Sequence, residues 1–243
     1  MCMKAKKITL DALRAFGKLK AVKGIDYRKR TASRIHFVND LNLYVGKVFH
    51  IGNTKLAKNI AIFSLKEIFT CLDCKDCLKD CYAVKASKAY PTVNNHRWLI
   101  TYMAINHLDI LKSWIYEELY KIAKNRKYVK YVRIHESGDF FNQDYLDMWY
   151  NVASMFPNFK FYFYTKSDKF LDFSKFVSLP NVNMVSSFLP DGSINFDDEP
   201  IITKKCHDMG VPLCPYGVNG DYNVHCGECA ICMRSSCVGF IKH

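Results

Sequence analysis

The sequence lacks any apolar stretch that approaches the ~20 residues needed to span a membrane. Its first residues, MCMKAKKITL, are basic and lack the apolar run of a secretory signal. It contains no Walker loop, no Gly-x-Gly-x-x-Gly fingerprint, no serine-nucleophile elbow and no zinc-protease helix motif. These absences argue against the common nucleotide-binding, hydrolase and protease classes. We expect a cytoplasmic protein with no membrane partner.

The sequence also has fewer acidic than basic residues. The chain has 23 Asp and Glu against 35 Lys and Arg, which gives a formal net charge of +12. Such a charge favours anionic partners, of which nucleic acid is the commonest. The alternative is a solvated basic surface, because the lysines are spread along the chain and form no single block.

Apolar residues and cysteines, by contrast, are plentiful. Hydrophobic residues make up 49% of the 243 residues and aromatic residues 14%, enough for one substantial domain plus a small appendage. There are eleven cysteines. In a reducing cytoplasm, clustered thiols usually hold metal, and disulfides are the minor alternative.

Strand-like and helix-like patterns alternate through the middle of the sequence, which predicts parallel βα units. We therefore expect an α/β fold that forms a partial or complete parallel (βα) barrel over residues 46–190. A basic lead-in segment would precede it at 1–45, and a cysteine-rich, metal-binding module would follow at 191–243. The expected strands cover 58–65, 128–140, 159–165 and 181–188, and the expected helices 94–125, 142–156 and 169–178.

The first chemical motif is a run of four cysteines directly after the first expected strand: Cys71, Cys74, Cys77 and Cys81. Intervals of two, two and three residues let one loop wrap around a polynuclear site, as in bacterial ferredoxins. Zinc is the competitor, although structural zinc sites usually draw cysteine pairs from separate turns. Unligated packing cysteines are the remaining alternative.

The second motif lies in the polar, glycine-rich C-terminal region, which needs something other than burial to hold it together. Its predicted metal ligands are Cys214, Cys226, Cys229 and Cys232. An iron-sulfur cluster, such as a second 4Fe-4S cluster, and zinc are both open here. Whether the nearby Cys206 and Cys237 are ligands is open too, and His207 and His225 are more typical of neighbouring hydrogen-bonding residues.

Polar residues also follow the expected strands, where parallel α/β folds place their binding groups. Strand alternation predicts that Arg133, His135 and Ser137 project together, with a tight turn at Gly138 and a ligand-binding carboxylate at Asp139. The alternative is that Ser137 and Asp139 cap the next helix, while Arg133 and His135 pair with a buried carboxylate.

The ends of the third and fourth expected strands add further candidates. Tyr162 and Tyr164 fit ordinary packing residues, whereas the residues after them are better candidates for binding. We predict catalytic roles for Arg133, His135 and Lys166, and cofactor-binding roles for Ser137, Gly138, Asp139, Thr165, Ser167 and Ser186.

Over roughly residues 50–190 the chain resembles the phage and plasmid family called gene product 88. The shared pieces are Asn53-Thr54-Lys55-Leu56, Phe63-Ser64-Leu65, Cys81-Tyr82-Ala83, Arg97-Trp98, SGDFF from Ser137 and YTKS from Tyr164. The resemblance places Cys71, Cys77 and Cys81 on family cysteine positions and leaves Cys74 off them. It implies a phage-encoded protein made in the host cytoplasm, and three ligands that would leave one iron of a cluster open.

The order of strand, cysteine loop, helix, strand and glycine-acid turn is similar, more distantly, to radical S-adenosylmethionine enzymes. That similarity implies S-adenosylmethionine as a cofactor, with Ser137-Gly138-Asp139 in place of the usual Gly-Gly-Glu, and a C-terminal auxiliary cluster. The usual Cys-x3-Cys-x2-Cys spacing is absent. Fold-level analogy alone does not establish function.

Two hypotheses follow. The first is an iron-sulfur enzyme of the radical S-adenosylmethionine type, served by a reductant protein. The second is a nucleic-acid-binding protein without catalysis, in which zinc or a cluster only stabilises loops.

Overall fold

The computed structural model describes the chain except for residues 1–35, 39–42, 46, 76 and 243. Most of the predicted lead-in segment at 1–45, including its helical pattern, lies outside the described residues. Its described part contributes an antiparallel pair, β1 (His36–Val38) with β2 (Leu43–Val45). None of the helices described is long and apolar enough to cross a membrane.

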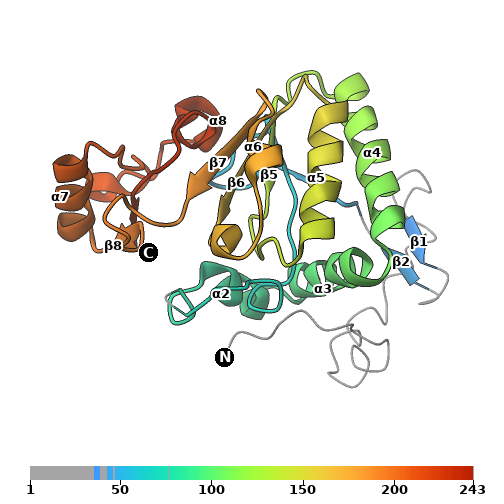
Figure 1. The fold of residues 1–243 in the computed structure, drawn as a ribbon, viewed down its shortest axis with the longest axis horizontal. Helices are drawn as coiled ribbons and strands as arrows, with labels where there is room; N and C mark the ends of the chain where they lie inside the picture. Colours follow the sequence, from blue (N-terminus) through green and yellow to red (C-terminus); the bar gives the residue numbers. More distant parts are fainter. Residues whose placement is uncertain (1–35, 39–42, 46, 76, 243) are drawn as a thin grey trace.

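The centre of the fold is a five-stranded sheet in the order β3-β4-β5-β6-β7 (Figure 1). β3 is antiparallel to β4, whereas the pairs β4–β5, β5–β6 and β6–β7 are parallel. The strands are β3 (His50–Ile51), β4 (Ile60–Ile62), β5 (Tyr131–Ile134), β6 (Lys160–Thr165) and β7 (Val182–Ser186).

This sheet confirms the predicted α/β class and its parallel strands. The neighbours in the sheet are also neighbours in the sequence, as expected for successive βα units. β3 and β7 are its edges within the described chain, so the sheet is open and a complete barrel does not form. A closed barrel needs further tilted strands to join the two edges, and this sheet has five strands.

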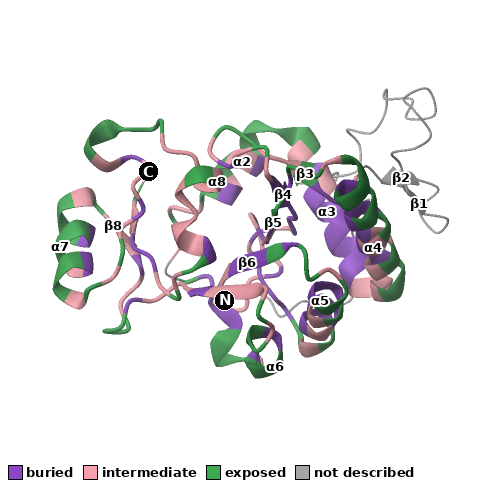
Figure 2. Cartoon of the chain, turned by 90° about the horizontal axis from the view of Figure 1, so that it is seen from above, coloured by how far each residue is buried: buried purple, intermediate pink, exposed green. Residues whose placement is uncertain are grey.

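The helices between the strands lie mainly on one face of the sheet, and α2 packs on α3. They are α2 (Tyr82–Ala89), α3 (Pro91–Asn106), α4 (Leu108–Asn125), α5 (Gln143–Met155) and α6 (Ser174–Val177), with a 3-10 turn η5 (Ser167–Lys169). Figure 2 shows the strands and the inner side of α3 buried and the outer turns of α4 exposed. This face supplies the main core, because Ala61, Val132, Phe161 and Phe163 pack against these helices.

Alternate residues of the same strands point to the opposite face. Ile60, Ile62 and Tyr162 pack there against Met233 of the C-terminal module (residues 191–243), as the two-residue period of a strand requires. The module lies beside the sheet, across from α4 and α5 (Figure 1). The sheet is therefore sandwiched between helices and a cysteine-rich layer.

The C-terminal module contains more regular structure than its sequence suggested. Helix α7 was not predicted, although Pro200 at its start and Gly210 at its end are typical helix boundaries. The elements are β8 (Phe196–Asp197), α7 (Glu199–Met209), η6 (Val218–Gly220), α8 (Cys226–Cys229), η7 (Ile231–Met233) and β9 (Phe240–Ile241).

Hydrogen bonds fix the module to the sheet. The Asn183 side chain in β7 donates to the carbonyls of Cys232 and Ser235, both at 3.0 Å. The Asn59 side chain, just before β4, donates to the Gly227 carbonyl at 3.2 Å. The segments that carry three of the module's cysteines are thereby fastened directly to strands of the sheet.

Candidate functional site

The first cysteine loop leaves the carboxyl end of β4 and returns at α2, where Cys81 is the residue before the first helical turn. Backbone bonds hold its start against the end of β5, with Leu65 N donating to the Ser137 carbonyl at 2.8 Å. Farther along, the Asp139 N–H donates to the Thr70 hydroxyl at 3.2 Å. The loop therefore lies over the carboxyl ends of the strands, where parallel sheets bind ligands.

Three thiols of this loop, Cys71, Cys77 and Cys81, are free and partly buried. Cys74 is buried and disulfide-bonded, so the prediction that it is a metal ligand is wrong: its sulfur is not a free thiolate. Burial raises the pKa of Cys71, and the neighbouring charges of Asp139, Cys77 and Cys81 raise it further. These mutual effects put the three free thiols in one electrostatic neighbourhood, although their present spacing is too wide for a single ion.

Lys166 contributes a cation to the same area. Its ammonium is buried and lies 5.7 Å from the centre of the Phe188 ring. Burial raises the pKa of the Cys77 thiol, and the positive charge of Lys166 partly offsets that rise. The predicted catalytic lysine and the first cysteine group are therefore neighbours.

Asp139 ties the strand ends together. Its Oδ1 accepts hydrogen bonds from Phe140 N at 2.7 Å and from the Thr165 hydroxyl at 2.8 Å, and its Oδ2 accepts one from Lys166 N at 3.0 Å. Burial raises the pKa of Asp139 to about 6 despite these bonds. The Ser167 hydroxyl also lowers the pKa of this carboxyl, so the protein itself engages Asp139 from several sides. The cofactor-binding role of Asp139 stays a prediction.

The neighbouring hydroxyls are also engaged with the protein. Ser167 Oγ donates to the Phe140 carbonyl at 2.7 Å, and Ser186 Oγ accepts from Phe188 N at 3.0 Å. Ser137 Oγ donates to the Glu67 carboxylate at 3.3 Å. The binding roles predicted for Thr165, Ser167, Ser137 and Ser186 are untested. Neither Ser137 nor Asp139 caps α5, since Asn142 accepts from Tyr145 N.

A buried ionic cluster beneath the loop was missed by the sequence interpretation. Glu67 lies 3.5 Å from Arg97, whose other nitrogen lies 3.7 Å from Glu136. Arg97 also donates to the Ala83 carbonyl at 3.0 Å, which joins α2 to α3. In the sequence, only the family resemblance singled out Arg97. Isolated carboxylates such as Glu67 and Glu136 leave no pattern that would mark them beforehand.

Arg133 and His135 do not share a face, so the predicted projection of Arg133, His135 and Ser137 together is wrong. β5 ends at Ile134, and His135 has φ +61°, which interrupts the alternation of a strand. Its ring points into the helical layer, where Nε2 lies 2.8 Å from the Tyr145 hydroxyl. Burial lowers the pKa of His135 to about 3.

Arg133 instead points toward the C-terminal module. Its guanidinium lies 4.8 Å from the centre of the Tyr164 ring. Burial alone would lower the pKa of Arg133, but Tyr82, Tyr162, Tyr164 and Glu136 outweigh it and raise that pKa. Arg133 thus remains a cation under the second group of cysteines.

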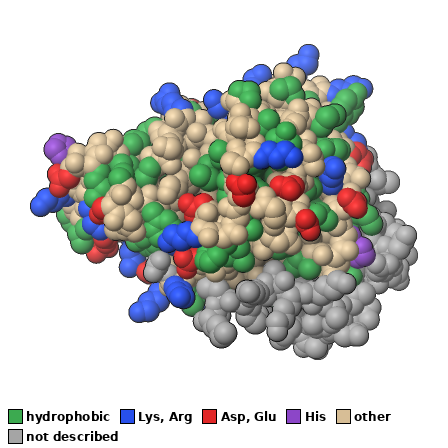
Figure 3. Space-filling model, in the orientation of Figure 1, with side chains coloured by type: hydrophobic (Ala, Val, Ile, Leu, Met, Phe, Trp, Pro, Cys, Tyr) green, Lys and Arg blue, Asp and Glu red, His purple; other side chains and the backbone are tan. Residues whose placement is uncertain are grey.

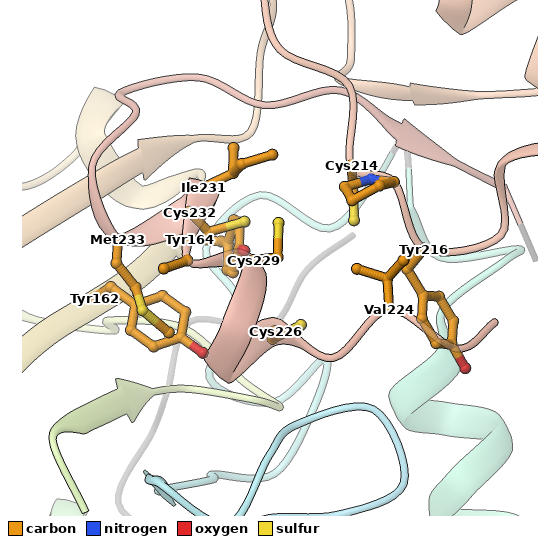
Figure 4. A pocket seen from close by; sticks show the side chains of 12 residues that line it. Tyr162, Tyr164, Cys214, Tyr216, Val224, Cys226, Cys229, Ile231, Cys232 and Met233 are labelled. Atoms are coloured by element: carbon orange, nitrogen blue, oxygen red, sulfur yellow. The ribbon is translucent and has the colours of Figure 1, made fainter. Parts of the chain in front are cut away.

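The four predicted ligands of that second group line a single pocket (Figure 4). Cys226 and Cys229 come from α8, Cys232 from η7, and Cys214 from the loop after α7. Tyr162 and Tyr164 of β6 line it from the sheet side, and the cavity measures ≈ 20 Å³. All four thiols are free.

The donor types in this pocket suit a thiolate-bound metal, but the present spacing of the thiols does not form a closed metal site. Burial raises the pKa of Cys232 to about 11, and the charges of Cys214 and Cys226 add to the rise. Four soft sulfur donors suit zinc or an iron-sulfur cluster, and such a metal deprotonates its thiols. Across the described part of the chain, no three His, Cys, Asp or Glu side chains stand close enough to hold a single ion.

Cys206 and Cys237 belong to a different cluster. Cys206 packs with Leu189 and Ile202 under α7, and Cys237 packs against that group. The Cys237 thiol donates to the Phe188 carbonyl at 3.3 Å. Neither lines the pocket of the four cysteines. His207 is 89% exposed on α7, and His225 precedes α8.

Comparisons with known proteins identify a family to which the chain is similar. The sequence profile of a family described as Gene product 88 matches residues 44–199. The Gene 88 protein of Mycobacterium phage D29 is 27% identical over 189 residues, 68% of this chain and 79% of that protein. The Gene 88 protein of Mycobacterium phage L5 is 28% identical over 188 residues, again 68% and 79%. No solved structure matches the chain. The family match contains the whole sheet and the first cysteine loop, and it ends before Cys214.

Proposed function

Because the chain belongs to the gene product 88 family, and because both of its cysteine groups lie against one parallel sheet, we propose that it is an iron-sulfur enzyme. Its first centre would use the thiols of Cys71, Cys77 and Cys81. Its second centre would use Cys214, Cys226, Cys229 and Cys232. The observation that carries the proposal is the position of three free thiols beside Lys166 and Asp139 at the carboxyl ends of the strands.

The first centre is proposed as the catalytic one. A 4Fe-4S cluster held by three thiolates has one iron without a protein ligand, and when bound together with S-adenosylmethionine it supplies one-electron reductive cleavage of that cofactor. A low-potential reductant protein of the host or phage would deliver the electron. The layout similarity to radical S-adenosylmethionine enzymes supports this choice of cofactor by analogy.

The residues of the chain have separate parts in this proposal. The buried Lys166 ammonium attracts an anionic group of the bound cofactor or substrate toward the thiols, because opposite charges attract strongly where water is scarce. Asp139 keeps the ends of β5 and β6 in place. The Phe188 ring beside Lys166 limits the access of water.

The second centre is proposed as an auxiliary cluster, with zinc as the alternative occupant. Its four thiol donors match the ligand number of either metal site. Burial under the module and the nearby cation of Arg133 support an anionic centre in this pocket. The host cytoplasm is the proposed location, because the cysteines of both proposed centres are free thiols.

Metal analysis under anoxia tests both centres. The protein, purified anaerobically, is assayed for iron, sulfide and zinc and scanned for the broad visible absorption of clusters. Two variants, with Cys71, Cys77 and Cys81 or with Cys226, Cys229 and Cys232 replaced by Ala, should each lose the metal of one centre and keep the other. The reduced protein should also release methionine from S-adenosylmethionine, and the variant that lacks Cys71, Cys77 and Cys81 should not. A colourless protein with zinc or no metal at Cys71–Cys81 would reject the enzyme proposal.

A further inference from the structure

The amino ends of the strands form an edge of the sheet on the opposite side from the first cysteine loop. Lys58 precedes β4, Lys130 precedes β5, and Lys160 begins β6. All three side chains are exposed. Backbone bonds align them, since Lys130 N donates to the Asn59 carbonyl at 2.9 Å and Lys160 N to the Lys130 carbonyl at 2.9 Å. Three adjacent strands therefore each carry a lysine at the same edge.

The connection from α4 to β5 extends this basic edge. Lys124 is in the last turn of α4, Arg126 follows the helix, and Lys127 and Tyr128 form the turn before β5. Lys124 and Lys127 are exposed, and Tyr128 is 52% exposed. The edge then consists of Lys58, Lys124, Arg126, Lys127, Lys130 and Lys160, together with Tyr128.

Acidic residues are missing from the segments that build the edge, residues 56–60, 121–131, 156–160 and 178–182. Glu228 is the nearby exception, because it follows Gly227, whose carbonyl contacts Asn59 at the Lys58 end. Figure 3 shows Lys and Arg side chains along the upper margin of the molecule, with no acidic side chain among them. Within the described chain, no salt bridge joins Lys124, Lys127, Lys130 or Lys160 to a carboxylate.

We propose that this edge binds the phosphate backbone of single-stranded nucleic acid, with the Tyr128 ring stacking on a base. Adjacent strands lie ~4.8 Å apart, so the three lysines form a row along this edge that can contact several phosphates of one strand. An exposed aromatic ring among cations is typical of surfaces that bind single strands. A membrane surface would instead require a broad apolar face beside the charges, and this edge is made of strand ends and a turn.

A matched pair of variants tests the proposal by fluorescence anisotropy with a labelled oligonucleotide of about 16 nucleotides. The edge variant carries Lys127→Ala, Lys130→Ala and Lys160→Ala. The control carries Lys88→Ala, Lys175→Ala and Lys204→Ala, which are exposed residues of α2, α6 and α7. Each removes three positive charges. Thermal melts establish that both variants fold.

The edge variant should bind at least ~10-fold more weakly than the unaltered protein. The slope of log K against log salt should become shallower by about 2, because each of the three lost phosphate contacts contributes about 0.7. The control should bind like the unaltered protein. Tyr128→Ala should weaken single-strand binding about 10-fold and leave duplex binding unchanged. Equal losses in both lysine variants, no binding by the unaltered protein, or a duplex affinity that falls equally in Tyr128→Ala would overturn the proposal.

This surface does not depend on the metal centres. The variant that lacks Cys71, Cys77 and Cys81 should keep its oligonucleotide affinity even when it has lost iron and the cleavage of S-adenosylmethionine. A fall in affinity that tracks metal loss would assign the binding to the cysteine side of the sheet and reject the amino edge.

Discussion

Arg133 is a cation placed among thiols and phenols. Burial raises the pKa values of Cys226 and Cys232. The positive charge of Arg133 opposes this effect and lowers both pKa values. Four thiolates around zinc or a cluster carry a net negative charge, so a nearby guanidinium would stabilise the loaded centre. Groups that surround a metal site in this way commonly affect metal affinity 10- to 100-fold.

We therefore predict that Arg133→Met weakens metal retention in the pocket about 10-fold, because it removes the compensating charge and keeps most of the side-chain volume. The measurement is competition with a chromophoric chelator, performed on the variant that has lost the first centre. Arg126→Met, at the amino edge, is the control and should retain metal normally. Arg133→Lys should recover part of the loss. Unchanged retention in Arg133→Met would contradict this role.

His135 is a residue whose burial has a pH consequence. The pKa of His135 falls to about 3 in the folded chain, whereas the unfolded chain regains the ordinary value of 6.5. Below pH 6.5 the unfolded state binds more protons, so stability is fully present above that value and is lost as pH falls toward 3. Asp139, with a pKa raised to about 6, acts oppositely between about pH 4 and 6.

The prediction is that, below pH 6.5, the unfolding free energy of the metal-free protein falls with acidity relative to that of His135→Phe, because both proteins share the opposing effect of Asp139. His135 contributes a slope of up to about 1.4 kcal/mol per pH unit. His135→Phe should be less stable at pH 7 by about 1–3 kcal/mol, since the Tyr145 hydroxyl loses its partner. Its stability deficit relative to the unaltered protein should shrink in urea unfolding as pH falls from 6 to 4, because only the unaltered protein carries the His135 contribution. An identical slope in both proteins would show that His135 is protonated in the fold.

At the scale of elements, the turn Ser137–Asp139 controls how the cysteine loop meets the sheet. Gly138 has φ +81°, and an added Cβ would lie 2.5 Å from the Thr70 hydroxyl and 2.8 Å from Leu65 Cβ. Both Thr70 and Leu65 begin the loop that carries Cys71. The glycine is thus required for backbone conformation and for close approach together.

Gly138→Ala should destabilise the protein by more than the conformational cost alone. Gly192 provides the matched control, because it has the same φ of +81° and open space around its Cβ position. We expect about 1 kcal/mol for Gly192→Ala and a further ~1–3 kcal/mol for Gly138→Ala from overpacking, measured by chemical unfolding. Gly138→Ala should also reduce the iron content of the first centre. Equal destabilisation by the two substitutions would mean that the loop moves aside freely.

At the scale of the molecule, the C-terminal module forms a layer that a small core and a few hydrogen bonds hold on the sheet. Its contact with β4 and β6 includes Met233, and its anchors include Asn183 and Asn59. A metal bound as proposed would add to the stability of this layer, because binding free energy adds to folding free energy.

Removing the metal should therefore release the module before the rest unfolds. Metal present at 100 times its dissociation constant stabilises by about 2.7 kcal/mol, and a chelator removes that contribution. Limited proteolysis of chelated protein should cut within residues 191–243 and leave a fragment that contains the sheet. The variant without Cys226, Cys229 and Cys232 should behave in this way without chelator. Equal protease resistance with and without metal would assign the pocket a packing role.

Local patterns in the sequence predicted much of the fold and part of the candidate site. The run from Phe159 to Thr165 predicts a buried strand because it is aromatic and apolar, and the structure places β6 between two packed layers. The spacing of Cys226, Cys229 and Cys232 predicted one site, and these cysteines do line one pocket. The sequence did not predict helix α7, because only its residues Ile202 and Cys206 are buried and the apolar periodicity is therefore weak.

The sequence by itself determined the α/β class, the two cysteine groups and the family, because each depends on neighbouring residues or on their spacing. Only the tertiary structure decided that Arg133 faces the module while His135 enters the core, since a single positive φ at the end of β5 reverses the direction of a side chain. It also decided that Lys58, Lys130 and Lys160 form one edge. Strand pairing joins residues far apart in the chain, and no local pattern records it.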